Sequence, residues 1–111
     1  MTYLELVPLL KAVTTYRTNS PRLPELAAWL RETLAALPLH KTLTTRELMA
    51  LAGMPADAPE RDSRRFISAL TYLRQSGIVD DCFRRDTFRK MAGRPLILWH
   101  RPVPVIEEEI F

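Results

Sequence analysis

The spacing of hydrophobic and polar residues predicts four helices followed by two strands. Apolar residues recur every three or four positions in four segments, a period typical of amphipathic helices. These segments are Pro8 to Tyr16, Pro24 to Ala36, Thr44 to Ala52 and Asp62 to Ser76. We place Pro8 in the first turn of the first helix, because a proline further inside would remove a backbone hydrogen bond.

The third predicted helix has the clearest local signature in the chain. Thr44 and Glu47 form a T-x-x-E capping box, and leucines on either side are placed to form a hydrophobic staple. Gly53 follows the last apolar residue and predicts a left-handed end to this helix. Gly77 predicts the same end for the fourth helix.

After Gly77 the period changes from helical to extended. Ile78 to Phe83 and Leu96 to Arg101 each predict a strand, and Leu39 to Leu43 is a candidate for a short third one. The polar, basic segment from Arg84 to Arg94 lies between the first two. The pattern therefore predicts a hairpin with a long, cationic tip.

The fourth predicted helix has two chemically different sides. Its apolar side consists of Phe66, Ile67, Ala69, Leu70 and Leu73. Its opposite side has cations and hydrogen-bonding groups without an acidic residue: Arg61, Arg64, Arg65, Ser68, Thr71, Tyr72 and Gln75. A helix that lies in a nucleic-acid groove needs such a side. The alternative is an ordinary solvated face, which usually mixes both signs of charge.

The net charge of +3 is unevenly distributed along the 111 residues. Residues 1–60 are neutral, residues 61–101 carry +6, and residues 102–111 carry −3. We expect one domain at 21–101, preceded by an N-terminal helix and connection at 1–20 and followed by an extended acidic tail at 102–111. The positive charge coincides with the fourth helix and the hairpin, which favours an anionic partner.

The sequence contains no recognisable catalytic or metal-binding motif. His40, His100 and Cys82 lack the spacing of zinc ligands, and Asp80 and Asp81 would point to opposite faces of a strand. We therefore expect neither an enzyme nor a cofactor or metal. A single cysteine, no leader-like start and no apolar run long enough for a membrane span predict a cytoplasmic protein.

The order of the elements resembles that of the winged helix-turn-helix superfamily. The resemblance rests on TTRELMALAGM (Thr44 to Met54), FISALTYLRQSGIV (Phe66 to Val79) and the basic hairpin. It implies a mainly helical α+β fold with a small β-hairpin, here with an extra N-terminal helix and an extended C-terminal tail. In that family the second helix of the motif enters the major groove of double-stranded DNA and the hairpin, or wing, contacts the backbone.

By this resemblance, the side chains facing DNA on the fourth helix would be Arg61, Arg64, Arg65, Ser68, Tyr72 and Gln75. The wing contacts would be Arg84, Arg85, Arg89, Lys90 and Arg94. The expected role is a DNA-binding transcription regulator or accessory factor, and the small size suggests a phage or mobile element. Dimerisation is a further possibility for such a domain.

Two other functions fit the same residues. Winged-helix domains also serve as protein–protein adaptors, in which case the basic wing would meet an acidic protein surface. A factor that prefers single strands would instead stack bases on Tyr72 or Phe88.

The C-terminal residues EEEIF resemble the acidic tip of bacterial single-stranded DNA-binding proteins. By that resemblance a protein partner would capture Glu107, Glu108, Glu109, Ile110 and Phe111. Disorder, competition with DNA for the basic face, and packing on a second subunit are the alternatives.

Overall fold

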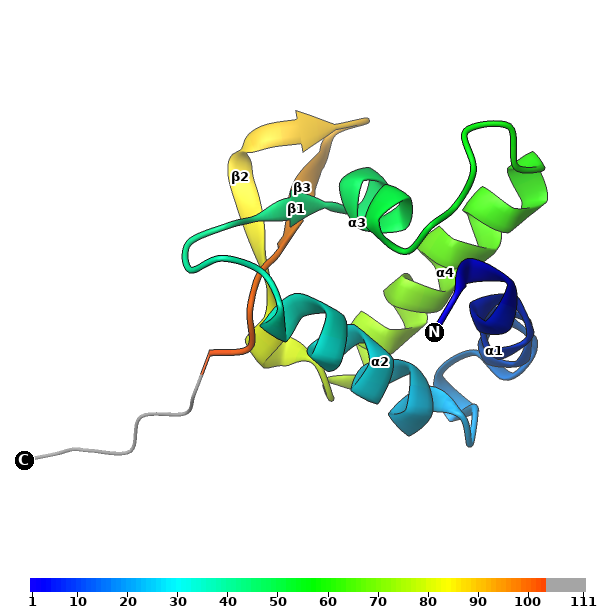
Figure 1. The fold of residues 1–111 in the computed structure, drawn as a ribbon. Helices are drawn as coiled ribbons and strands as arrows, with labels where there is room; N and C mark the ends of the chain where they lie inside the picture. The colour runs from blue at the N-terminus through cyan, green and yellow to red at the C-terminus, as the bar shows by residue number, and fades with distance from the viewer. Residues whose placement is uncertain (104–111) are drawn as a thin grey trace, which may run out of the picture.

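A computed structural model describes residues 1–103 and shows helices packed beside a small three-stranded antiparallel sheet (Figure 1). The helices are α1 (Tyr3–Tyr16), α2 (Leu23–Ala35), α3 (Thr45–Leu51) and α4 (Glu60–Ser76). The strands are β1 (Leu43–Thr44), β2 (Phe83–Met91) and β3 (Arg94–Trp99). Short 3-10 turns lie at Arg17–Asn19 and Asp80–Cys82. The predicted α+β class is confirmed.

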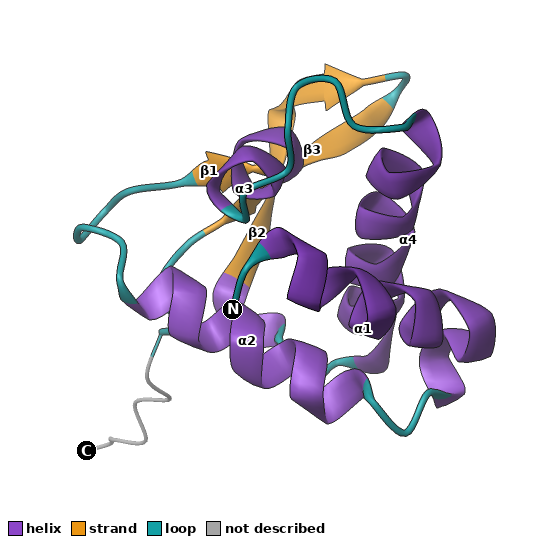
Figure 2. Ribbon diagram, turned by 45° about the vertical axis from the view of Figure 1, so that its right-hand side comes forward, coloured by secondary structure: helices purple, strands orange, loops and turns teal. Residues whose placement is uncertain are grey.

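The core lies where α1, α2 and α4 meet the base of the sheet, and α3 lies between the helices and β3 (Figure 2). Phe66 of α4 and Trp99 of β3 are completely buried in it. Trp99 also donates a hydrogen bond from Nε1 to the Thr45 hydroxyl, at 3.0 Å, which ties the sheet to the start of α3. Trp29 packs edge-on against Phe66, with ring centroids 6.3 Å apart.

The first helix begins five residues earlier than predicted. Thr2 and Glu5 form a reciprocal capping box, with the Thr2 amide donating to Glu5 at 2.8 Å, so α1 starts at Tyr3. Pro8 lies inside the helix, which contradicts its placement in the first turn. The Pro8 side chain is exposed. Its nitrogen has no hydrogen to donate to the Leu4 carbonyl, and Leu4 is also exposed to solvent. Burial of the residues before Pro8, including Tyr3 and Leu6, therefore offsets one lost hydrogen bond.

The predicted ends of α3 and α4 are largely confirmed. Thr44 and Glu47 form the expected capping box at the start of α3. Gly53 and Gly77 have φ angles of 94° and 83°, in the left-handed region that favours glycine after a helix. The fourth helix begins at Glu60, two residues before the predicted start.

The predicted strand from Ile78 to Phe83 is wrong for most of its length. Arg31 of α2 donates hydrogen bonds to the Ile78 carbonyl and to Asp81, the latter at 2.6 Å. These bonds favour a compact connection, in which residues 80–82 form a 3-10 turn and Val79 and Cys82 are buried.

The strands of the hairpin are therefore displaced from their predicted positions. β2 begins at Phe83 and continues through most of the segment expected to be the tip, which leaves only Ala92 and Gly93 in the turn. β3 runs from Arg94 to Trp99, two residues earlier than predicted. It is the central strand, in the order β1-β3-β2. The short segment expected before α3 contributes only β1.

Candidate nucleic-acid interface

A groove of about 420 Å³ separates α3 and α4 from the hairpin. Its walls are Thr44, Thr45 and Arg46 from β1 and α3, Ile67, Leu70, Thr71 and Arg74 from α4, and Arg94, Pro95, Leu96 and Ile97 from β3. Three of these residues are arginines, and among the described residues no Asp or Glu lines the groove. The groove therefore combines three guanidinium groups and three threonine side chains with apolar residues.

The arginines around the groove come from elements far apart in sequence. Arg46 and Arg94 are exposed on α3 and β3, whereas Arg74 of α4 is half-buried. The guanidinium of Arg74 lies 5.6 Å from the centroid of the Phe83 ring, and that of Arg85 lies 5.5 Å from the same ring. Cation–π contact thus holds Arg85 of β2 beside Arg74. Three arginines from α3, α4 and β3 therefore line the groove, and a fourth, from β2, lies beside Arg74.

The closeness of these two arginines affects the pKa of Arg74. Burial, and then the neighbouring charge of Arg85, lower the pKa of the Arg74 guanidinium. The group remains charged at neutral pH, because arginine deprotonates only at very high pH. A nearby anion would relieve the repulsion between the two cations.

The side of α4 that lines the groove is not the cationic side that the sequence predicted to face DNA. Ile67, Thr71 and Arg74 lie four and seven residues apart and share one side of the helix. Ile67 was expected in the core but is 37% exposed at the groove. Arg74 and Arg46 were not among the predicted contacts, because neither belongs to the cationic side of α4 or to the hairpin.

A different set of predicted contacts lies on the flank of α4 nearer to α1. Arg65, Ser68 and Tyr72 share this flank and are all half-buried. Burial and then Asp62 raise the pKa of Tyr3 in α1, while the nearby charge of Arg65 lowers it. Tyr72 packs against the hydrophobic core. These residues do not line the groove. Arg61 and Gln75 are exposed on α4 but also lie outside its lining.

Two predicted contacts form ion pairs with neighbours on the same element. Arg64 pairs with Glu60 at 3.1 Å, and Arg89 pairs with Asp86 at 2.7 Å. Because α4 starts at Glu60, its polar side does carry an acidic residue, contrary to the sequence interpretation. Both pairs are at the surface, where such interactions are weak and a phosphate can compete for the arginine.

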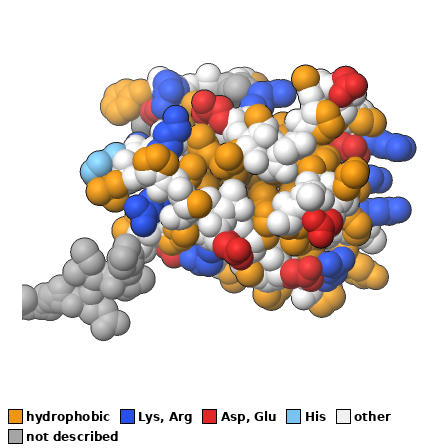
Figure 3. Space-filling view, viewed as in Figure 1, with side chains coloured by type: hydrophobic (Ala, Val, Ile, Leu, Met, Phe, Trp, Pro, Cys, Tyr) orange, Lys and Arg blue, Asp and Glu red, His pale blue; other side chains and the backbone are white. Residues whose placement is uncertain are grey.

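The predicted wing residues are divided between the two faces of the sheet. Arg85 pairs in register with Ile97, which lines the groove, whereas Arg84 pairs with Leu98. Because successive side chains in a strand point to opposite faces, Arg84 lies on the other side. Lys90 is exposed next to the turn. Figure 3 shows Lys and Arg side chains both at the upper left, over the hairpin, and along the right-hand edge, where α1 and the start of α4 lie.

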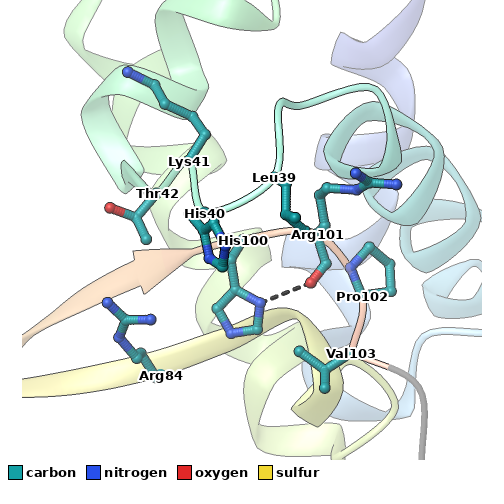
Figure 4. Close-up of a pocket in the computed structure, with 9 residues that line it drawn as sticks. All are labelled: Leu39, His40, Lys41, Thr42, Arg84, His100, Arg101, Pro102 and Val103. Atoms are coloured by element: carbon teal, nitrogen blue, oxygen red, sulfur yellow. Dashed lines mark hydrogen bonds between the residues drawn. The ribbon is translucent and has the colours of Figure 1, made fainter.

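Arg84 lines a second hollow of about 650 Å³ on the far side of the sheet. The hollow lies between the segment before β1 and the end of β3, and Leu39, His40, Lys41, Thr42, Arg84, His100, Arg101, Pro102 and Val103 line it. The His100 ring is anchored by a contact of 2.7 Å between Nδ1 and the Arg101 carbonyl oxygen. Figure 4 shows the two histidines close together in that view, while Lys41 and Arg101 project away from them. The cations of this hollow therefore do not converge on one point.

The single cysteine is packed between polar neighbours but is itself buried. Burial, and then the charge of the adjacent Asp81, raise the pKa of the Cys82 thiol to about 11. The thiol is therefore protonated at neutral pH and acts as a small core residue. Within residues 1–103, no three His, Cys, Asp or Glu side chains are grouped as metal ligands would be. No helix in that range combines the length and the apolar character needed to cross a bilayer.

The predicted partner-binding tail, Glu107, Glu108, Glu109, Ile110 and Phe111, lies outside the described residues. Comparison with known proteins adds no further assignment: no known protein family, curated protein or solved structure matches this chain.

Proposed function

We propose that this protein binds double-stranded DNA through the groove between α4 and the hairpin. The observation that carries the proposal is the gathering of Arg46, Arg74 and Arg94 around one groove, with Arg85 held beside Arg74. Phosphates supply most of the affinity of such an interface, and guanidinium groups bind them with two parallel hydrogen bonds. Thr71 and Arg74 of α4, which line the groove, can then form hydrogen bonds with the edges of bases.

The arrangement of elements supports the same proposal. A helix, a short strand, two further helices and a hairpin, with strand order β1-β3-β2, are compatible with a winged helix-turn-helix domain. In this proposal α4 is the recognition helix and β2 and β3 form the wing. α1 is an addition that packs along α4. The protein would act as a transcription regulator or accessory factor rather than as an enzyme.

The test is fluorescence anisotropy with a mixed-sequence 20-bp duplex over a range of salt concentrations. The wild type is compared with Arg46→Gln/Arg94→Gln in the groove. Removing two phosphate contacts should reduce the magnitude of the slope of log affinity against log salt by about 1.8. The matched control, Arg61→Gln/Arg65→Gln, removes the same charge from residues outside the groove lining and should change the slope much less.

Three outcomes would contradict the proposal. The first is an absence of wild-type binding to the duplex at about 50 mM salt, where phosphate contacts act strongly. Equal losses in the two double variants would show that net charge alone drives association. A larger loss in the control would move the interface to the start of α4, as the sequence pattern suggests.

A second candidate, a protein–protein adaptor, is favoured by the apolar part of the groove. Ile67, Leu96 and Ile97 lie beside the arginines, a combination that fits an acidic amphipathic helix of a partner protein. Arg46→Glu/Arg94→Glu separates the two candidates. If this variant stays folded and keeps its DNA affinity, the groove serves a protein partner instead.

A further inference from the structure

The hairpin displays an aromatic ring with almost no protein contact. Phe88 is 98% exposed, more than any other large hydrophobic residue that the structure describes. It lies in an irregular part of β2, where Asp86 pairs with Leu96 but Lys90 pairs with Pro95. Three residues of β2, from Thr87 to Arg89, therefore bulge out of the sheet, since the neighbouring strand has no residue opposite them.

The bulge is held in place by Asp86. Its Oδ1 accepts hydrogen bonds from the backbone amides of Phe88 and Arg89, at 3.0 and 3.3 Å. Its Oδ2 accepts a third from Nε of Arg89, at 2.7 Å. These bonds hold the pKa of the Asp86 carboxyl below its ordinary value, with the Arg89 contact as the largest cause. Hydrogen bonds thus fix the backbone that presents Phe88 to solvent.

The surroundings of the ring are cationic. Arg89 and Lys90 follow it directly in the chain, and both are exposed. The one acidic residue between Arg84 and Arg94 is Asp86, which is already paired with Arg89. A phenyl ring left in water forgoes the free energy that burial of its apolar surface would supply. A partner that offers an apolar flat surface next to negative charge would recover it.

Nucleic acid offers this combination, because the faces of its bases lie beside its phosphates. Arginine and lysine side chains bind phosphates without help from an aromatic ring, so the exposed ring of Phe88 calls for a different kind of contact. Apolar side chains are known to stack on unpaired bases or to wedge into a base step from the minor groove.

We propose that Phe88 stacks on the face of a nucleobase when the hairpin contacts DNA. The inference rests on the proposed function and adds a contact with bases to a hairpin otherwise suited to phosphates. The base is supplied either by a step of the duplex that the ring opens or by a single strand. The flanking cations bind the adjacent phosphates in both cases.

The test measures binding of Phe88→Ala and Phe88→Trp to duplex and single-stranded DNA containing the fluorescent base 2-aminopurine. Loss of one stacked base weakens binding by about 5- to 150-fold. The slope of log affinity against log salt should not change for either variant, because stacking releases no counterions. Trp should preserve affinity and alter 2-aminopurine emission. Leu4→Ala removes another exposed apolar side chain, on α1, and should behave as the wild type.

The results separate this inference from the proposed function. If the wild type binds DNA and Phe88→Ala binds equally well, the stacking inference is wrong while the DNA interface stands. If the wild type binds neither form of DNA, both fail. An effect confined to the duplex identifies a wedge at a base step, and one confined to the single strand identifies an unpaired base. Loss of binding to phosphatidylserine vesicles alone would make the ring a membrane contact and overturn the inference.

Discussion

The contact between Arg31 and Asp81 joins two parts of the chain that are 50 residues apart, so it offers a sensitive test of the fold. Arg31 donates from Nη1 to Asp81 at 2.6 Å and from Nη2 to the Ile78 carbonyl. These bonds attach α2 to the connection between α4 and β2. We predict that Arg31→Ala destabilises the protein by weakening this attachment, without changing the helices themselves.

The size of the effect follows from the exposure of the two side chains. A hydrogen bond to a charged group contributes about 1.5–3 kcal/mol, and an exposed ion pair about 0.2–1 kcal/mol. The Arg31 and Asp81 side chains are 37% and 32% exposed, so solvent screens the pair but does not remove it. We expect Arg31→Ala to lower the free energy of unfolding by about 1–2 kcal/mol, and Asp81→Asn by about 1 kcal/mol.

The effect of Asp81→Asn should also depend on pH. The hydrogen bond from Arg31 is the main cause that holds the pKa of the Asp81 carboxyl below its ordinary value. An aspartate with a lowered pKa in the folded state stabilises that state fully above its unfolded pKa, about 3.9, and loses this effect as the pH falls through the folded value. The stability difference between wild type and Asp81→Asn should be constant near neutral pH and shrink below pH about 4.

The assay is urea denaturation followed by circular dichroism, because urea adds no ions that would screen the pair. Arg22→Ala is the control: Arg22 pairs with Glu25 at 2.8 Å within one helical turn and is more exposed. Its removal should have a clearly smaller effect than removal of Arg31. Equal effects of the two substitutions, or a stability difference for Asp81→Asn that grows at low pH, would refute the reasoning.

Three further predictions concern single residues. Thr44→Ala removes the N-cap of α3 and should cost about 1 kcal/mol in urea denaturation, whereas Thr44→Ser should restore most of the stability. Gly77→Ala forces a side chain into a φ of 83° and should cost about 1 kcal/mol; no change in the midpoint would show that the helix ends differently. Tyr3→Phe should leave the thermal midpoint unchanged or raise it, because the buried Tyr3 hydroxyl has no hydrogen-bond partner in the described structure. A lower midpoint would indicate a bound water or an undetected partner.

Local features of the sequence predicted α3 and the ends of α4 well. The capping box of Thr44 and Glu47 and the glycines after the two helices act within a few residues, so their effect can be read without knowing the fold. Thr2 and Glu5 have the same capping-box spacing. The expectation that proline is excluded from a helix interior nevertheless predicted a later start, at Pro8. That expectation failed there because burial along α1 exceeds the cost of one missing hydrogen bond at an exposed position.

The lining of the groove could be predicted less well, because helix period identifies an apolar side without showing what covers the polar flanks. Arg65 and Tyr72 are half-buried, Tyr72 against the core, whereas Arg74 lines the groove. Arg46 could have been proposed from its position in the first turn of α3, but nothing in the local pattern places that turn opposite the hairpin. The chemical type of the surface, arginine-rich and next to the hairpin, was nevertheless evident in the charge distribution.

The sequence by itself determined that four segments are helical, where glycines end α3 and α4, and that positive charge accumulates from residue 61 onward. These properties depend on residues close in sequence. Only the tertiary structure decided where β2 begins, which side of α4 is accessible and which arginines share a groove. Each of these depends on a contact between distant segments: Arg31 with Asp81, α1 with α4, and Arg74 with Phe83. Such contacts depend on packing geometry, which the spacing of residue types does not encode locally.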